Sequence, residues 1–243
     1  MKVLRVLVTT TALLAAGAAM ADEAVVHDSY AFDKNQLIPV GVRAEAGTTG
    51  YGGALLWQAN PYVGLALGYN GGDVSWRDDV SVNGTKYDLD MDNNNVYLNA
   101  EIRPWGASPN RWAQALYVAA GAAYLDNDYD LTKRSQDGTI KVNGNNYNFN
   151  GSVDGKLSYK NDIAPYVGVG FSPKINKNWG VFGEVGAYYT GNPSVKLTQY
   201  NLDPVTGNPT SAQDAVDNEA REIANDDKYQ WMPVGKLGVS YHW

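Results

Sequence analysis

Apolar and polar residues alternate along eight short segments of the chain, which is the pattern of β-strands with two different faces. The segments span 39–47, 55–59, 63–70, 96–103, 116–124, 162–171, 179–189 and 231–243. In the last of them, Leu237, Val239 and Tyr241 fall on one face, with Lys236 and Ser240 on the other. An even number of such segments is typical of barrels that cross a membrane with strands. The pattern predicts an all-β fold, a transmembrane eight-stranded antiparallel up-and-down β-barrel with long extracellular loops.

The connections between these segments differ in length at the two ends of the predicted barrel. Those at 60–61, 104–111 and 172–178 are short, and those at 71–94, 126–158 and 190–229 are long, although the first connection, at 48–52, is short and breaks the trend. Short periplasmic turns and long extracellular loops are the usual asymmetry of outer-membrane barrels. This asymmetry gives the predicted barrel a direction across the membrane.

Two of the long loops contain an Asn-Gly pair, and the third contains a helical pattern. Asn83-Gly84 and Asn143-Gly144 each lie between alternating residues, which favours a type I′ hairpin turn. After Pro209, Ser211 can cap a helix, with Asp214 three residues later. Small and apolar residues from Ala212 to Ala224 share one helical face, and we expect Asp217, Glu219 and Glu222 on the opposite, polar face. Either a short helix packed over the barrel mouth or an irregular acidic loop accounts for the segment.

The first 21 residues resemble a secretory signal peptide. Lys2 and Arg5 precede an apolar stretch of small residues, and Ala19-Met20-Ala21 is an A-x-A-like cleavage site. The expected domains are therefore a signal peptide (1–21), a periplasmic N-terminal segment (22–36) and the barrel (37–243). The expected location is the outer membrane of a Gram-negative bacterium, reached by Sec export.

The composition excludes several classes of function. Without Lys2 and Arg5, 17 basic side chains face 26 acidic ones, a net charge of −9 that argues against nucleic acid as a partner. The only two histidines, His27 and His242, lie away from the expected extracellular rim, and there is no cysteine. Catalysis at an outer-membrane site usually needs a histidine beside a nucleophile. We therefore expect no enzyme, no cofactor and no metal site.

Acidic residues gather in the first two long loops. We call them the acidic rim and expect them to concentrate cations at the barrel mouth, within the screening distance of roughly 8–10 Å. The aspartates that begin at Asp88 and at Asp126 have the opening spacing of a calcium-binding loop, but the glycine and glutamate that such a loop requires are missing. A solvated rim is therefore the better interpretation. The rim comprises Asp73, Asp78, Asp79, Asp88, Asp90, Asp92, Asp126, Asp128 and Asp130.

Six charged residues fall on the inward face of the predicted strands: Arg43, Glu45, Glu101, Arg103, Glu184 and Lys236. Ionisable residues at membrane depth suggest a functional site, here for permeation. The alternative is a paired polar core, because three bases balance three acids and the interior of an eight-stranded barrel is filled by side chains.

The end of the chain carries a specific signal. Gly238, Tyr241 and Trp243 resemble the polar-x-Gly-x-x-aromatic-x-aromatic pattern that the barrel assembly machinery reads. We therefore expect that machinery to be a partner during biogenesis.

Three stretches, LIPVGVRAEAGTTGYGG (37–53), NNNVYLNAEIRPWG (93–106) and WGVFGEVGAYYTGNP (179–193), together with the signal peptide, resemble the CarO family of carbapenem-associated outer-membrane proteins. The resemblance covers most of the chain. It implies an eight-stranded barrel whose loss is associated with carbapenem resistance. It also implies a proposed role in the uptake of small basic amino acids such as ornithine, and a disputed passage of carbapenems. Because eight strands enclose a space that side chains fill, we expect any such uptake to be slow and selective.

Two functional hypotheses follow. The first is a narrow uptake protein for small cationic or zwitterionic solutes, embedded among outer-membrane lipid and lipopolysaccharide. The second is a closed structural or surface-interaction barrel with no continuous pore, which the small strand number favours.

Overall fold

The computed structural model describes residues 38–82, 85–134, 138–159, 162–205 and 210–243. The predicted signal peptide and the predicted periplasmic segment, 22–36, lie outside these residues. The elements are β1 (Gly41–Gly47), β2 (Gly50–Asn60), β3 (Val63–Val82), β4 (Thr85–Ile102), α2 (Arg111–Gln114), β5 (Leu116–Leu125), β6 (Asp128–Arg134), β7 (Thr139–Val142), β8 (Asn145–Tyr159), β9 (Ile163–Phe171), β10 (Trp179–Tyr189), β11 (Pro193–Pro204), α3 (Ala212–Asn225), η2 (Asp227–Gln230) and β12 (Trp231–His242).

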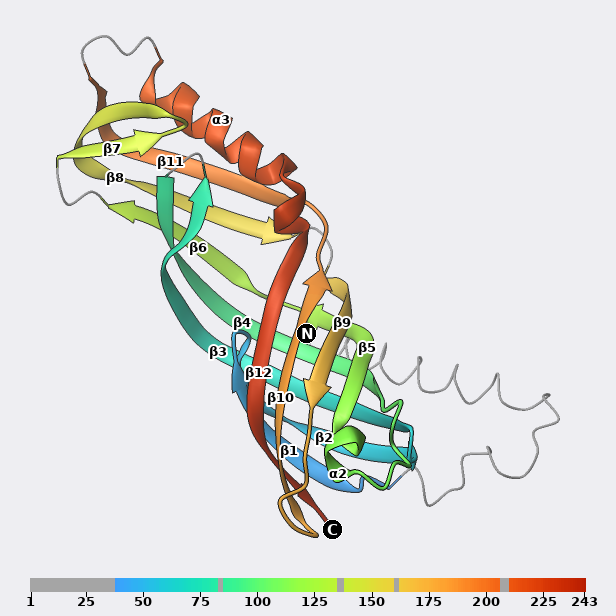
Figure 1. Cartoon of the computed structure of the whole chain (residues 1–243). Helices are drawn as coiled ribbons and strands as arrows, with labels where there is room; N and C mark the ends of the chain where they lie inside the picture. The colour runs from blue at the N-terminus through green and yellow to red at the C-terminus, as the bar shows by residue number, and fades with distance from the viewer. Residues whose placement is uncertain (1–37, 83–84, 135–137, 160–161, 206–209) are drawn as a thin grey trace, which may run out of the picture. The chain divides into compact units, whose positions relative to one another are not determined.

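Eight of these strands form a closed antiparallel ring. Strands β1 to β5 pair in succession, from β1 with β2 to β4 with β5, and β5 then pairs with β9. β9 pairs with β10, β10 with β12, and β12 closes the ring on β1 (Figure 1). These strands correspond to the eight alternating segments of the sequence. The predicted up-and-down barrel of eight strands is confirmed.

The ring strands alternate between two environments, most regularly in β9. In β9, Ala164 and Tyr166 are buried inside, whereas Ile163, Val167 and Val169 are 50–61% exposed on the outer wall. A soluble protein would not expose such a row of branched apolar side chains, but a hydrocarbon environment favours it. Aromatic residues lie at both ends of this apolar wall, as in the Trp179–Tyr241 and Tyr189–Trp231 contacts. Tryptophan and tyrosine prefer the two membrane interfaces.

A second sheet grows out of the ring at the long-loop end. β3 and β4 continue past the ring, β6 pairs with the far half of β4, β8 pairs with β6, and β11 pairs with β8, while β7 also pairs with β8 (Figure 1). We call this sheet the extension. The Asn-Gly hairpin at the β7–β8 turn is present, with φ of 47° at Asn143 and 78° at Gly144, as a type I′ turn requires. The matching pair, Asn83-Gly84, lies outside the described residues.

Helix α3 covers one face of the extension, and its main partners are β11, β7 and β8. Ser211 caps its first turn by accepting a hydrogen bond from the Asp214 backbone N–H at 3.1 Å, so the predicted helix and cap are confirmed. The expected placement over the barrel mouth is wrong, because the apolar face of the helix packs against the extension. Ala215, Val216 and Ile223 are fully buried against Leu131, Val142, Val153 and other side chains of the sheet. The long loops therefore have an apolar core of their own.

The expected polar position of Glu219 is wrong. Its side chain is fully buried beneath α3, where it accepts hydrogen bonds from the Tyr87 hydroxyl at 2.6 Å and from the Asn143 backbone N–H. Glu219 lies three residues after Val216, four after Ala215 and four before Ile223. This helical spacing places it on the buried face of α3. Burial and the Glu219 carboxylate raise the pKa of Tyr87, in the extension, well above its ordinary value, which keeps the phenol protonated as a donor.

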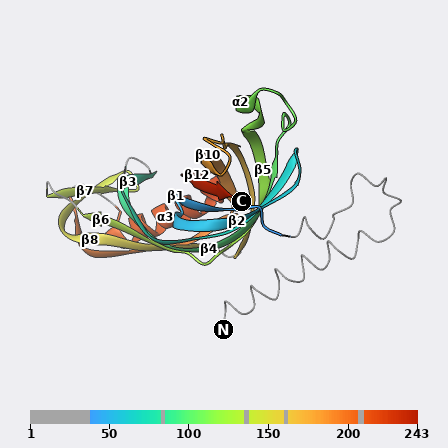
Figure 2. The same cartoon turned by 90° about the horizontal axis from the view of Figure 1, so that it is seen from below.

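Within the described residues, no helix is long and apolar enough to cross a membrane. The short helix α2 lies beside β5 in the turn that precedes it (Figure 2).

Candidate functional site in the barrel interior

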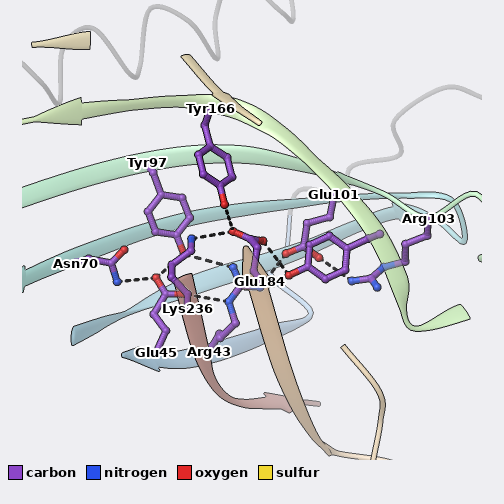
Figure 3. A network of polar contacts seen from close by, with 10 residues as sticks. Arg43, Glu45, Asn70, Tyr97, Glu101, Arg103, Tyr166, Glu184 and Lys236 are labelled. Atoms are coloured by element: carbon purple, nitrogen blue, oxygen red, sulfur yellow. Dashed lines mark hydrogen bonds and ion pairs between the residues drawn. The ribbon is translucent and has the colours of Figure 1, made fainter. Parts of the chain in front are cut away.

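The six charged residues singled out in the sequence meet inside the ring. Arg43 and Glu45 are two residues apart on β1, Glu101 is on β4, Glu184 on β10 and Lys236 on β12 (Figure 3). These five are buried, with at most 5% of each residue exposed, and Arg103, just past the end of β4, has a side chain that is 16% exposed. Strand alternation places them inside, and the closed register brings them together.

Arg43 is the centre of the first half of this network. Its guanidinium donates to Glu101 at 2.8 Å, to Glu45 at 3.2 Å and to the Tyr97 hydroxyl at 3.3 Å. Arg103 donates to the other oxygen of Glu101 at 2.6 Å. Arg43 also lies 4.2 Å from the centre of the Phe182 ring, a cation–π contact. Two arginines and two glutamates thus balance each other around one side of the lumen.

Glu45 is satisfied by neutral donors as well as by Arg43. The Asn70 amide and the Tyr97 hydroxyl both donate to its Oε1 at 2.7 Å. Buried carboxylates are stable only when their lone pairs are filled in this way.

Glu184 and Lys236 form the second half. They lie directly opposite each other in the β10–β12 register, with Nζ 3.1 Å from Oε1. The Tyr117 and Tyr166 hydroxyls each donate to Glu184 at 2.8 Å. The ammonium of Lys236 contacts Glu184 without hydrogen-bond geometry, and it lies 4.2 Å from the centre of the Tyr97 ring. The electrostatic pair is therefore enclosed by aromatic rings.

Inward-facing glycines make room for these tyrosines. A Cβ at Gly68 would lie 2.3 Å from the Tyr97 ring, and one at Gly170 would lie 2.1 Å from the Tyr117 ring. Each tyrosine thus covers the backbone of the strand beside it, a packing known to support glycine in sheets. The tyrosines are thereby held where their hydroxyls reach the glutamates.

Polar side chains line one strand from the long-loop end towards this network. Asn93, Asn95 and Asn99 face inward on β4, and each is at most 2% exposed. Neither polar atom of the Asn95 or Asn99 amide has a hydrogen-bond partner among the described protein groups, and Asn93 Oδ1 has none either. Buried amides need partners, so these groups are available to water or to a small polar solute.

The acidic rim does not surround the barrel mouth. Asp73, Asp88, Asp90, Asp92, Asp128 and Asp130 are exposed on the face of β3, β4 and β6 that continues the outer wall of the ring. The inward face of the same strands, with Tyr87 and Met91, packs beneath α3 instead. Asp126 is half-buried in the turn before β6, and the side chains of Asp78 and Asp79 lie outside the described residues. In the described part of the chain, no three acidic or histidine side chains are placed to hold a metal ion.

The three residues of the predicted assembly signal lie along the last strand. Tyr241 and Trp243 are on the outer wall, 37% and 62% exposed, and the Trp243 backbone N–H donates to Val40 O at 3.3 Å. Gly238 lies opposite Glu45 at the β1–β12 seam, where a Cβ would lie 2.0 Å from Ala44 O.

A closed antiparallel ring with an apolar outer wall, aromatic ends and a charged interior defines an outer-membrane β-barrel. Comparison with solved structures gives the family. Acinetobacter baumannii CarO is 71% identical, with a TM-score of 0.75 over 86% of this chain and 100% of that one. A. baumannii CarO2 is 65% identical, with the same TM-score and coverage. The chain belongs to the CarO family.

Two further comparisons bear on this assignment. A 29 kDa outer membrane protein of A. baumannii is 96% identical over 24 residues, which are 10% of this chain and all of that sequence. No family model matches the chain. The solved structures and the 24-residue match agree: the protein is an outer-membrane protein of the kind found in Gram-negative bacteria, and its family is not a family of enzymes.

The assembly signal makes a direct prediction. Deleting Trp243 should strongly reduce membrane insertion, because the last strand would lose its terminal aromatic anchor and its bond to Val40 at the seam. The heat-modifiable folded band on unheated gels of outer membranes measures insertion. Trp105→Ala is the matched control, because it also removes an exposed tryptophan but one that lies in a turn and not in the last strand. Normal insertion without Trp243 would contradict the predicted signal.

Proposed function

We propose that the barrel takes up small basic or zwitterionic solutes, amino acids such as ornithine, slowly and selectively. The observation that supports this best is the polar line on β4, in which Asn93, Asn95 and Asn99 lead to the ionic network. Carboxylates and cations lie close together in that network. A solute that carries both an ammonium and a carboxylate matches both kinds of group.

The same network explains why transport would be slow. Arg43, Glu45 and Glu184 are nearly fully buried and bonded to one another or to tyrosines across the lumen. Eight strands enclose a space that side chains fill. A solute must therefore replace some of these contacts with its own charges as it passes, and this favours small ions over a rigid, bulky carbapenem.

A closed barrel is the second candidate. The balanced pairing of three bases with three acids favours it, because a paired network also serves as a stable polar core. In that case the extension and α3, and not the lumen, would carry the function.

Flux into liposomes separates the two candidates. We expect the mature protein in liposomes to admit radiolabelled ornithine faster than empty liposomes do, with a carbapenem entering more slowly. Asn95→Leu should lower the ornithine flux several-fold, because it places an apolar side chain in the polar line. Asn94→Leu, the same change on the exposed outer face of β4, is the matched control. Ornithine flux equal to that of empty liposomes would overturn the proposal and leave the closed barrel.

A further inference from the structure

A pocket of about 390 Å³ lies at the short-turn end of the ring, away from the extension. Its walls come from both sides of the barrel: Val40 before β1, Gln58 on β2, the β4–β5 turn with α2, the β9–β10 turn, and the two last residues. Since β2 and β9 lie on opposite sides of the eight-stranded ring, the pocket belongs to the periplasmic mouth and not to the lipid-facing wall. A volume of this size suits a small ligand.

The pocket is lined by four basic side chains, Arg103, Arg111, Lys174 and Lys177, which come from two different turns. Among the described residues, no carboxylate side chain lies within ion-pair distance of Arg111, Lys174 or Lys177. Arg103 is balanced by Glu101. Within the described ranges, Arg111, Lys174 and Lys177 therefore leave the pocket positively charged, in a protein whose overall charge is negative.

Arg103 gives the pocket a fixed donor. Its side chain is 16% exposed, and its guanidinium lies 4.9 Å from the centre of the Tyr117 ring. One nitrogen, Nη2, is bonded to Glu101, while the other guanidinium nitrogens have no acceptor among the described groups. A guanidinium held on one side and open on the other suits two-point contact with an oxyanion. Lys174 and Lys177 add positive charge to the pocket, and an ammonium group binds an oxyanion with less directional preference than a guanidinium does.

We propose that this pocket is a binding site for the phosphate or carboxylate group of a soluble periplasmic molecule. Arg103 and Arg111 contact the oxyanion, and Lys174 and Lys177 attract and retain it. Because the pocket opens at the end of the barrel axis, a soluble anion reaches it more readily than a lipid head group does. The proposal does not require that any solute crosses the barrel.

The test is a titration of the full mature protein, folded in zwitterionic micelles, with inorganic phosphate at constant ionic strength. The NMR signals of the Arg103 and Arg111 Nε–H groups report binding. We expect both to shift in a saturable manner, while chloride at the same ionic strength gives no saturation. Lys174→Gln/Lys177→Gln should weaken phosphate binding by about tenfold. A non-saturable response, an adventitious ion only, would overturn the proposal.

Two further measurements complete the experiment: a matched control variant, and a measurement in lipid nanodiscs. Lys156→Gln/Lys196→Gln removes two lysines from the exposed face of the extension and should leave the phosphate affinity unchanged. Equal affinity in the Lys174/Lys177 variant would also overturn the proposal. In nanodiscs containing phosphatidylglycerol, saturation of the Arg103 signal before phosphate is added would assign the site to a lipid phosphate and exclude a soluble ligand.

Discussion

Glu184→Ala should destabilise the barrel by about 3–5 kcal/mol. The substitution removes the partner of Lys236, whose side chain is 1% exposed, and the acceptor of the Tyr117 and Tyr166 hydroxyls. An unpaired charge in the barrel interior is costly because no bulk water reaches it. Equilibrium unfolding by urea in lipid vesicles, followed by tryptophan fluorescence, measures the change.

A second substitution identifies the cause of this loss. Glu184→Ala/Lys236→Met removes both charges and should recover at least half of the lost stability, because the buried charge is gone and methionine fills the space. The exposed pair Asp130–Lys156, 3.8 Å apart, is the matched control, and Asp130→Ala should cost less than about 1 kcal/mol. A double variant as unstable as the single one would show that the ion pair is not the source.

Glu219→Ala should release α3 from the extension without opening the ring. The substitution leaves the Tyr87 hydroxyl and the Asn143 N–H without this buried acceptor. Unsatisfied buried donors cost about 1–3 kcal/mol each, and because the Asn143 N–H is only partly buried we expect the lower part of the sum, about 2–4 kcal/mol. This corresponds to roughly 30- to 700-fold faster hydrogen exchange in residues 212–225.

Hydrogen exchange with mass spectrometry localises that effect. Peptides from α3, β7 and β8 should lose protection, whereas peptides from β10 and β12 should keep it. Glu222→Ala makes the same change on the exposed face of the helix and should alter exchange by less than about threefold. If α3 exchanges at the same rate in Glu219→Ala as in the unmodified protein, the Glu219 carboxylate does not hold the helix on the extension.

The ring could be predicted from the sequence because its signal is local. A strand between lipid and a polar lumen alternates residue by residue, so Arg43 and Glu101 could be placed inside without any knowledge of their partners. Their pairing could not be predicted, since it depends on the register of strands that are far apart in sequence. The Glu184–Lys236 pair is an example, because only the β10–β12 register sets these residues opposite each other.

The extension was not predicted as a sheet, although its strands also alternate: in β8, Tyr147, Val153 and Leu157 are buried and polar residues stand between them. The pairing of these strands depends on segments that are far apart in the chain. β6, β8 and β11 bury one face against a helix that follows later in the chain, and their exposed faces carry charged residues such as Asp130 and Lys156. Glu219 was misplaced because its residue type outweighed its helical spacing. The basic pocket was missed because Arg111 and Lys174 lie in separate turns that meet only when the ring closes.

The ionic network divides along the seam that closes the barrel. Arg43, Glu45, Glu101 and Arg103 come from the N-terminal part of the ring and sum to zero charge. Glu184 and Lys236 come from the paired C-terminal strands β10 and β12 and also sum to zero. Each half can therefore pair its own charges before β1 and β12 meet. Whichever half forms first, it does not need to bury a charge whose partner belongs to the other half.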